Sequence, residues 1–289
     1  MNIVTRFAPS PTGRLHLGHA YSAVHAHRLA REGNGAFLLR IEDIDPGRSR
    51  AEHVDGIFED LLWLGLEWDG ETIYQSERIE LYAEALERLK GQGLAYPCFC
   101  TRSAIAAEIR SSAAAPHGPE GAVYPGTCRR LSDKVQSERA ASEPHAWRLD
   151  VAKAAALAGS LSWHDEGASD VDAIPSIFGD VVLARKDAPV SYHLAVTVDD
   201  AAQGITDIVR GSDLFEATHV HRLLQALLGL PTPRYHHHPL LLGPDGTRLA
   251  KRNGAPMLAQ LRLAGADPEK LRQDLLGGRL PAGYSVAAP

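Results

Sequence analysis

The chain has 289 residues, of which 44% are hydrophobic and 23% are charged, a composition typical of a globular protein with a sizeable core. Its net charge of −6 excludes a surface that attracts nucleic acid everywhere, so any RNA must be bound by local patches of Arg and Lys. The sequence has neither a run of about 18 apolar residues nor a signal peptide, so we expect a cytoplasmic protein without a membrane span.

The first elements predict a parallel α/β fold. We expect a short strand over residues 2–7, a loop rich in Pro and Gly over 8–13, a helix over 17–32 and a buried strand over 36–41. Strand, helix and strand in this order indicate a βαβ unit. Two more helices are expected. The first is indicated by apolar residues at helical spacing, which are Val54, Ile57, Leu61 and Leu64. The second is expected over residues 78–90, with Ser76 as its N-cap.

The second half of the chain is less regular. Residues 101–146 are rich in Ala, Ser, Pro and Gly, which indicates an inserted module or loop region. Strands are expected over 174–184 and 191–198, and an amphipathic helix over 213–228. Further elements are a strand over 240–242, a tight turn over 243–246 with a return strand, and loosely packed residues from 277 on.

Two histidines stand where the first loop enters a helix. His16 and His19 lie at a predicted helix start, where anionic phosphates bind, and their imidazoles can donate hydrogen bonds to phosphate oxygens. Gly18 between them lets a base or ribose approach the backbone. Alone, the motif is equally well explained by two histidines on a helix surface.

A cluster of cations near the other end of the chain changes this balance. Arg248, Lys251 and Arg252 follow the predicted tight turn, and a cationic loop suits the leaving pyrophosphate of ATP. A charge run is usually a solvated face, so neither motif is sufficient by itself. The pair, in this order, predicts an ATP-dependent site that forms an adenylate.

Three cysteines, Cys98, Cys100 and Cys128, lie in one short window and could bind zinc. Zinc prefers four ligands, so a fourth is needed, and His117 or water could supply it. The alternative is three reduced cysteines without a metal. The run His236–His238 suggests a second metal site, but we favour a structural or adenine-flanking role, because alternate side chains of an extended segment face opposite ways.

Three blocks of sequence resemble the glutamyl- and glutaminyl-tRNA synthetases. They are RFAPSPTGRLHLGHA from Arg6 to Ala20, LRIEDIDPGRSR from Leu39 to Arg50, and PLLLGPDGTRLAKRNGAP from Pro239 to Pro256. The last block, the lysine loop, departs from the family in having Arg248 where Lys is common and Ala250 where Ser is common. The resemblance covers most of residues 1–260.

The resemblance implies a class I synthetase fold. This is a Rossmann-type parallel sheet with an inserted zinc-binding α/β module and a short helical C-terminal region. The expected divisions are the first half of the catalytic domain at 1–95, the inserted module at 96–185, the second half at 186–235, and the lysine-loop region with a helical tail at 236–289.

The resemblance also assigns the site, with glutamate as the amino acid. Glu42 would hold the α-ammonium group, Arg6 and Arg210 the two carboxylates, and Tyr192 a hydrogen bond. The remaining expected positions are Ala8 and Ser10 for glutamate, Gly18 and Arg248 for ATP, His16, His19 and Lys251 for catalysis, and Tyr124 as the fourth zinc ligand beside Cys98, Cys100 and Cys128. One Zn²⁺ and the Mg²⁺ that accompanies ATP are the expected ions.

Only 37 residues follow Arg252, too few for an anticodon-binding domain. The chain therefore resembles the short members of the family, which attach glutamate to the queuosine base of tRNA(Asp). The expected partners are ATP, L-glutamate and queuosine-containing tRNA(Asp), and the expected state is a monomer. The alternatives are a truncated enzyme that charges a tRNA 3′ end, a nucleotidylyltransferase, and a non-enzymatic RNA- or zinc-binding paralogue.

Overall fold

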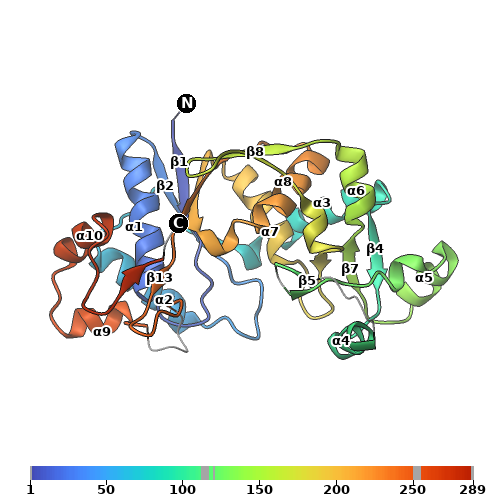
Figure 1. Ribbon diagram of the computed structural model, residues 1–289, viewed down its shortest axis with the longest axis horizontal. Helices are drawn as coiled ribbons and strands as arrows, with labels where there is room; N and C mark the ends of the chain where they lie inside the picture. Colours follow the sequence, from blue (N-terminus) through green and yellow to red (C-terminus); the bar gives the residue numbers. More distant parts are fainter. Residues whose placement is uncertain (1, 112–116, 120, 250–254, 288–289) are drawn as a thin grey trace.

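The protein is described by a computed structural model that covers residues 2–111, 117–119, 121–249 and 255–287. The elements are arranged along one long axis (Figure 1). The first strands and helices lie beside the C-terminal helices at one end, and the module that carries α4 (Arg102–Ser111) and α5 (Asp133–Ala140) projects at the other. The alternation of strands and helices and the parallel pairing confirm the predicted α/β class.

Two largely parallel sheets form the body of the molecule. The first has the order β1-β2-β3 and consists of β1 (Val4–Phe7), β2 (Ala36–Ile41) and β3 (Ile73–Tyr74). The second has the order β11-β12-β8-β9 and consists of β11 (Asp207–Gly211), β12 (Arg234–His238), β8 (Ser162–Asp165) and the antiparallel β9 (Ser169–Asp172). The amide of Thr206 donates to the carbonyl of Val4 at 3.0 Å, so the two sheets meet at β1 and β11.

Five longer helices pack around these sheets. They are α1 (Leu17–Glu32), α2 (Ala51–Trp63), α3 (Ile79–Gly91), α7 (Tyr192–Ala202) and α8 (Ala217–Leu228). The buried face of α1 includes Ala20, Ala23 and Ala26, whose small side chains let the helix approach the sheet closely. Gly35, just before β2, is needed for the close approach of the two strands, because a Cβ there would collide with the carbonyl oxygen of Ile3.

The inserted module has its own antiparallel sheet. Its strands, in the order β10-β7-β4, are β4 (Ala95–Cys98), β7 (Ala146–Leu149) and β10 (Val182–Ala184). Its other elements are α4 (Arg102–Ser111), β5 (His117–Gly118), β6 (Gly121–Ala122), α5 (Asp133–Ala140), α6 (Val151–Ala158) and the 3₁₀ turn η2 (Cys128–Arg130). Asp180 stabilises the module by accepting from Tyr96 at 2.6 Å and from Arg129 at 2.9 Å.

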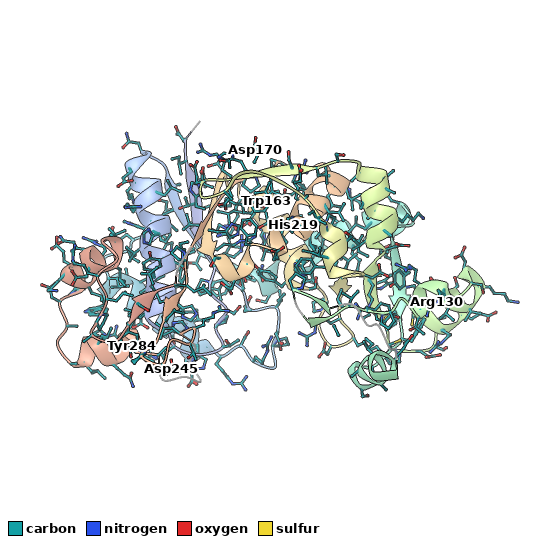
Figure 2. The ribbon with its side chains drawn as sticks, in the orientation of Figure 1. Arg130, Trp163, Asp170, His219, Asp245 and Tyr284 are labelled. Atoms are coloured by element: carbon teal, nitrogen blue, oxygen red, sulfur yellow. The ribbon has the colours of Figure 1, made fainter. Side chains whose placement is uncertain are left out.

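The C-terminal segment packs back onto the first sheet and α1. It contains β13 (Leu241–Leu242), α9 (Leu258–Leu263), α10 (Pro268–Leu276) and β14 (Ser285–Val286). The tail is only partly packed: β14 pairs with β13 and Tyr284 is partly buried against the core, but none of residues 277–287 is fully buried. Asp245 lies on the turn after β13, and Tyr284 lies just before β14. Both are at the same end of the molecule (Figure 2).

Several predicted elements match and others do not. The helix over 17–32 and the strand over 36–41 are confirmed. The strand over 191–198 is wrong, because this segment is α7, which begins after the N-cap Ser191 and is buried on nearly every side, so its sequence shows no helical period. Within 174–184 only β10 is a strand, and it follows the 3₁₀ turn η3 (Pro175–Phe178).

Two predicted helix starts also differ. Ser76 does not cap α3; it lies in the 3₁₀ turn η1 (Gln75–Glu77) and its hydroxyl donates to Asp43 at 2.6 Å. The helix predicted from residue 213 begins at Ala217, after the 3₁₀ turn η4 (Ser212–Leu214). Across the described parts of the chain, no helix combines the length and apolarity needed to cross a bilayer.

Candidate active site

The turn that opens α1 fixes both predicted histidines. Nδ1 of His16 accepts from the amide of Gly18 at 3.1 Å, and Nδ1 of His19 accepts from the amide of His16 at 3.1 Å. Each neutral ring therefore carries its proton on Nε2, ready to donate to an anion. The two rings are stacked with centroids 3.8 Å apart. Gly18 leaves room for this arrangement, since a Cβ would lie 3.0 Å from Cε1 of His16.

The segment after the lysine loop is joined to the same turn. The amide of Leu17 donates to the carbonyl of Pro256 at 3.0 Å, and the amide of Leu258 donates to the carbonyl of Leu15 at 3.0 Å. Before the loop, the amide of Leu249 donates to the carbonyl of Leu241 at 2.9 Å. The structure thus brings the two motifs together from opposite ends of the chain. Lys251 itself lies outside the described residues.

Arg248 belongs to the described part of the loop. Its guanidinium forms an ion pair with Asp213 at 2.7 Å, and its side chain is 58% exposed. Asp213 lies just after β11, so this pair ties the lysine loop to the second sheet.

The predicted glutamate ligands come from three parallel strands and one helix: Arg6 lies on β1, Glu42 directly after β2 and Arg210 on β11, and Tyr192 is the first residue of α7. Burial raises the pKa of Tyr192, and the charges of Arg210, Glu42 and Arg6 act on the same hydroxyl. Four residues chosen from the sequence therefore lie within electrostatic range of one another. The amide of Glu42 donates to the carbonyl of Pro9 at 3.0 Å, which places the loop with Ala8 and Ser10 beside Glu42. The hydroxyl of Tyr192 has no hydrogen-bond partner among the described residues.

A buried network of charges supports Arg6 and Glu42, and the sequence reading missed it. Arg40 is fully buried on β2 and contacts Asp200 at 2.8 Å and Glu42 at 3.3 Å. Asp200 also accepts from Arg6 at 2.9 Å. Although burial alone would raise the pKa of Asp200, Arg6 and Arg40 hold it below its usual value. A charged residue inside the apolar run AFLLRI was the signal for such a network.

Asp199, the neighbour of Asp200, continues this network toward α3. It accepts from Gln75 at 2.8 Å, from Arg78 at 2.7 Å and from Tyr82 at 2.7 Å. Burial raises the pKa of Glu42, and the cations Arg40 and Arg6 oppose this rise. Glu42 is therefore a buried acid whose charged form depends on nearby cations, which suits a group that binds an ammonium.

Arg210 has a different environment. Its guanidinium donates to Nε2 of His237 at 3.1 Å, to Nδ1 of His221 at 3.3 Å and to the hydroxyl of Thr218 at 2.6 Å. The run His236–His238 forms the last three residues of β12, so it is an extended segment as expected. Its side chains do face different partners: His236 contacts Asp207 at 2.8 Å and His238 contacts Ser22 at 2.7 Å. This supports the structural interpretation of the run.

A cavity of about 740 Å³ opens beside the glutamate ligands. Ser10, Glu42 and Tyr192 line one part of it, and Cys100 and Tyr124 of the module line another. The inserted module therefore forms a wall of the same chamber. Arg185 and Lys186 also line the cavity and offer positive charge to an anionic ligand.

The cysteine cluster is a plausible metal centre. The sulfur atoms of Cys98, Cys100 and Cys128 lie within 4.8 Å of one another. The hydroxyl of Tyr124 is 3.5 Å from Sγ of Cys100, and it also accepts from the amide of Cys128 at 2.9 Å. Burial raises the pKa of the Cys100 thiol to about 11, so a cation must displace its proton for the thiolate to bind. The side chain of His117 lies outside the described part of the chain.

The fold and this arrangement of motifs are those of a class I aminoacyl-tRNA synthetase. Residues 2–285 match the family described as tRNA synthetases class I (E and Q), catalytic domain, and the chain belongs to this family. It is an enzyme of the aminoacyl-tRNA synthetase type, and the match confirms the predicted fold class.

Within this class the chain is similar to proteins named glutamyl-Q tRNA(Asp) synthetase. The one from Rhodobacter capsulatus is 48% identical over 94% of this chain and 99% of the relative. The one from Symbiobacterium thermophilum is 46% identical over 91% of this chain and 82% of the relative. A solved glutamate tRNA ligase from Elizabethkingia meningosepticum, in complex with its amino acid, is 28% identical with a TM-score of 0.73. That match covers 88% of this chain and 53% of the ligase, so the chain spans about half its length.

Proposed function

We propose that the chain activates L-glutamate with ATP and transfers the glutamyl group to the queuosine base of tRNA(Asp). Two observations support the first half: the charges of Glu42 and Arg210 act on the buried hydroxyl of Tyr192, and the turn that opens α1 fixes the rings of His16 and His19. One carboxylate, and one guanidinium that no described carboxylate pairs with, offer complementary charges to an amino acid with an extra carboxylate. The acceptor is supported by the names of relatives that are 46–48% identical over nearly the whole chain.

In the first step, an oxygen of the glutamate α-carboxylate attacks the α-phosphorus of ATP, and the bond to pyrophosphate breaks. His16 and His19 donate from Nε2 to the phosphate oxygens, and Lys251 neutralises the pyrophosphate that leaves. An Mg²⁺ ion bound with ATP would add positive charge at the phosphates. Gly18 and Arg248 complete the contacts to ATP. Positioning and electrostatics supply the catalysis, with no covalent intermediate on the enzyme.

In the second step, a hydroxyl of the queuosine cyclopentenediol attacks the carbonyl carbon of the adenylate. An ester forms, AMP leaves, and the hydroxyl proton is released. The cavity between Tyr192 and Cys100 is the route that we propose for this acceptor, because it starts at the glutamate ligands and its lining does not include the His16–His19 turn.

The cysteine cluster, with Tyr124, is the site that we propose for one structural zinc ion. Three sulfur ligands and a phenolic oxygen provide four donors, the number that zinc prefers. The bound ion would hold the thiolates and keep β4 next to η2. The same proposal includes domain divisions at residues 95, 185 and 235, a monomeric state and a cytoplasmic location.

The proposal is tested by glutamate-dependent exchange of pyrophosphate into ATP, followed by transfer of labelled glutamate to RNA. We expect exchange by the wild type and transfer to tRNA(Asp) with queuosine, but not to the same tRNA without it or to tRNA(Glu). Charging of tRNA(Glu) would favour the truncated-synthetase alternative. ATP binding without exchange would favour a non-enzymatic paralogue.

The role of Lys251 is tested in the same assay. Lys251→Ala should abolish exchange, whereas Lys270→Ala, which removes a 74% exposed cation on α10, should leave it unchanged. Near-normal exchange in Lys251→Ala would contradict the assignment.

A further inference from the structure

Arg210 is a buried cation that is held by neutral groups. Only 6% of the residue is exposed, and its three hydrogen bonds go to His237, His221 and Thr218. Within the described part of the chain, Arg210 forms no ion pair with a carboxylate. A buried charge normally has a partner of opposite sign, because removing it from water is unfavourable.

The other two buried arginines of this region obey that rule. Arg6 and Arg40 both contact Asp200, and Arg40 also contacts Glu42. The positive charges on one side of the site are therefore already compensated within the protein. Arg210 differs from Arg6 and Arg40, because no carboxylate of the described residues compensates its charge.

The hydrogen bonds of Arg210 determine the tautomers of its neighbours. A guanidinium only donates, so Nδ1 of His221 and Nε2 of His237 must accept. The remaining ring protons then point away from Arg210. His237 donates from Nδ1 to Asp165 at 2.6 Å, and His221 donates from Nε2 to His193 at 3.2 Å. Both rings are thus neutral when they hold Arg210.

Burial and the adjacent guanidinium favour the same protonation state. Burial, followed by the charge of Arg210, lowers the pKa of His237 to about 4 and the pKa of His221 well below its ordinary value. Neither ring can neutralise Arg210, and neither adds a positive charge near neutral pH.

The nearest acid in this chain of contacts is separated from Arg210 by one imidazole. Asp165 reaches His237 but not Arg210. Trp163 covers the far side: its ring meets His237 with centroids 5.8 Å apart, and it lies close to His219 in the middle of the molecule (Figure 2). Trp163 is 2% exposed, so water is kept from this side and the uncompensated charge acts at low dielectric.

We propose that Thr218, His221 and His237 set the preference of this site for glutamate over glutamine, by holding Arg210 in place without neutralising it. The inference rests on the proposed glutamate activation. Glutamate and glutamine have side chains of nearly the same shape, so the site must distinguish them by charge. The matched family includes synthetases for both amino acids, and the surroundings of Arg210 decide which of the two is selected.

The test compares His221→Asp with His221→Asn, two variants of the same shape that differ in charge. Both keep an oxygen near the position of Nδ1, but the aspartate neutralises Arg210. Relative to the Asn variant, we expect the Asp variant to raise the KM for glutamate roughly tenfold or more and to reduce the glutamate-to-glutamine ratio of kcat/KM by a similar factor. The KM for ATP should stay the same in both variants.

A control pair separates this effect from added charge in general. The control variants are His164→Asp and His164→Asn. His164 is next to Asp165 on β8, and the side chain of His164 is 44% exposed. The two His164 variants should have the same glutamate KM. Equal KM values and equal selectivity in His221→Asp and His221→Asn would overturn the inference, provided that the wild type activates glutamate. A wild type that does not activate glutamate would instead overturn the proposed function itself.

A second pair keeps the inference testable if a charge at position 221 prevents folding. Thr218→Val removes the hydroxyl that accepts from Arg210, whereas Thr218→Ser retains it. We expect the glutamate KM of the Val variant to exceed that of the Ser variant about fivefold or more, with kcat for activation changed less. Identical KM values in these two variants would also overturn the inference. Thermal unfolding of each variant checks that it is folded.

Discussion

Leu17 and Pro256 are joined by a backbone hydrogen bond of 3.0 Å, which connects the start of α1 to the segment that follows the lysine loop. His16 lies next to Leu17 and forms an isolated bridge with Met257. The geometry of the predicted nucleotide site therefore depends on contacts between segments from the two ends of the chain. A change at this turn should affect catalysis more than amino-acid binding.

Gly18→Ala should lower the rate of pyrophosphate exchange. The added Cβ would lie 3.0 Å from Cε1 of His16 and displace this imidazole from its capping position. We expect kcat to fall about ten- to a hundredfold, with the glutamate KM changed little. The control is Gly91→Ala at the end of α3, where a Cβ meets nothing within 4 Å. Equal kcat in the two variants would contradict a positioning role for Gly18.

Arg40→Met should destabilise the fold strongly. It removes the buried cation that contacts Glu42 and Asp200, and the remaining carboxylates repel one another. We expect the free energy of unfolding to fall by about 3–5 kcal/mol, measured by urea denaturation. Arg48→Met removes a 69% exposed side chain paired with Asp45 and should change stability by about 0.5 kcal/mol or less. Similar losses in both variants would argue against the buried network.

Asp60 should make stability depend on pH. Its side chain is fully buried on α2, neither carboxylate oxygen has a hydrogen-bond partner among the residues that the structure describes, and Arg262 is 3.7 Å away. Burial raises its pKa from 3.8 to about 6, despite the opposing charge of Arg262. The folded state therefore holds this proton more tightly than the unfolded state, so stability falls as the pH rises from about 4 to about 6.

Asp60→Asn cannot release this proton and should lack that part of the pH dependence. We expect the free energy of unfolding of the variant, relative to that of the wild type, to be higher at pH 7.5 than at pH 4. The expected increase in this difference is on the order of 2 kcal/mol. Urea denaturation of both proteins at the two pH values measures the difference. A constant difference between wild type and variant at both values would show that Asp60 titrates normally.

Zinc analysis should separate the ligands of the cysteine cluster. Purified wild type should contain one zinc ion per chain, and Cys128→Ser should lose it. Tyr124→Phe should retain the three thiolates and bind zinc about tenfold or more weakly, measured by competition with a coloured chelator. Unchanged affinity in Tyr124→Phe would assign the fourth position to another donor, and metal-free wild type would rule out the site.

The first βαβ unit could be predicted because its signals are local. The apolar run of β2 and the breakers at Gly33–Gly35 bound their elements within the sequence itself. The helix α7 could not, because Leu194, Val196 and Val198 are all buried by neighbouring elements and the β-branched residues resemble a strand. Burial on all sides removes the alternation from which a helix is recognised.

The residues of the candidate site also differ in whether the sequence alone predicts them. His16, His19 and Glu42 belong to short motifs, so a sequence suffices to select them, whereas Arg210 lies outside the three blocks and is assigned by the family resemblance alone. The residues that surround these side chains and set their charge are distant in sequence. Asp200 contacts Arg40 across 160 positions, and His237 contacts Arg210 across 27. Tertiary packing brings such residues together: α7 places Asp200 against Arg40 of β2, and the parallel pairing of β11 with β12 places Arg210 beside His237 in register.

The bonds that join Leu15 and Leu17 to Leu258 and Pro256 also govern when this protein becomes competent during synthesis. The ribosome makes the His16–His19 turn first, and its backbone partners Pro256 and Leu258 follow only after the region between them has been synthesised. Until these partners emerge, the turn lacks the bonds that hold it, and the apolar face of α1 lacks the part of its cover that Leu258 supplies.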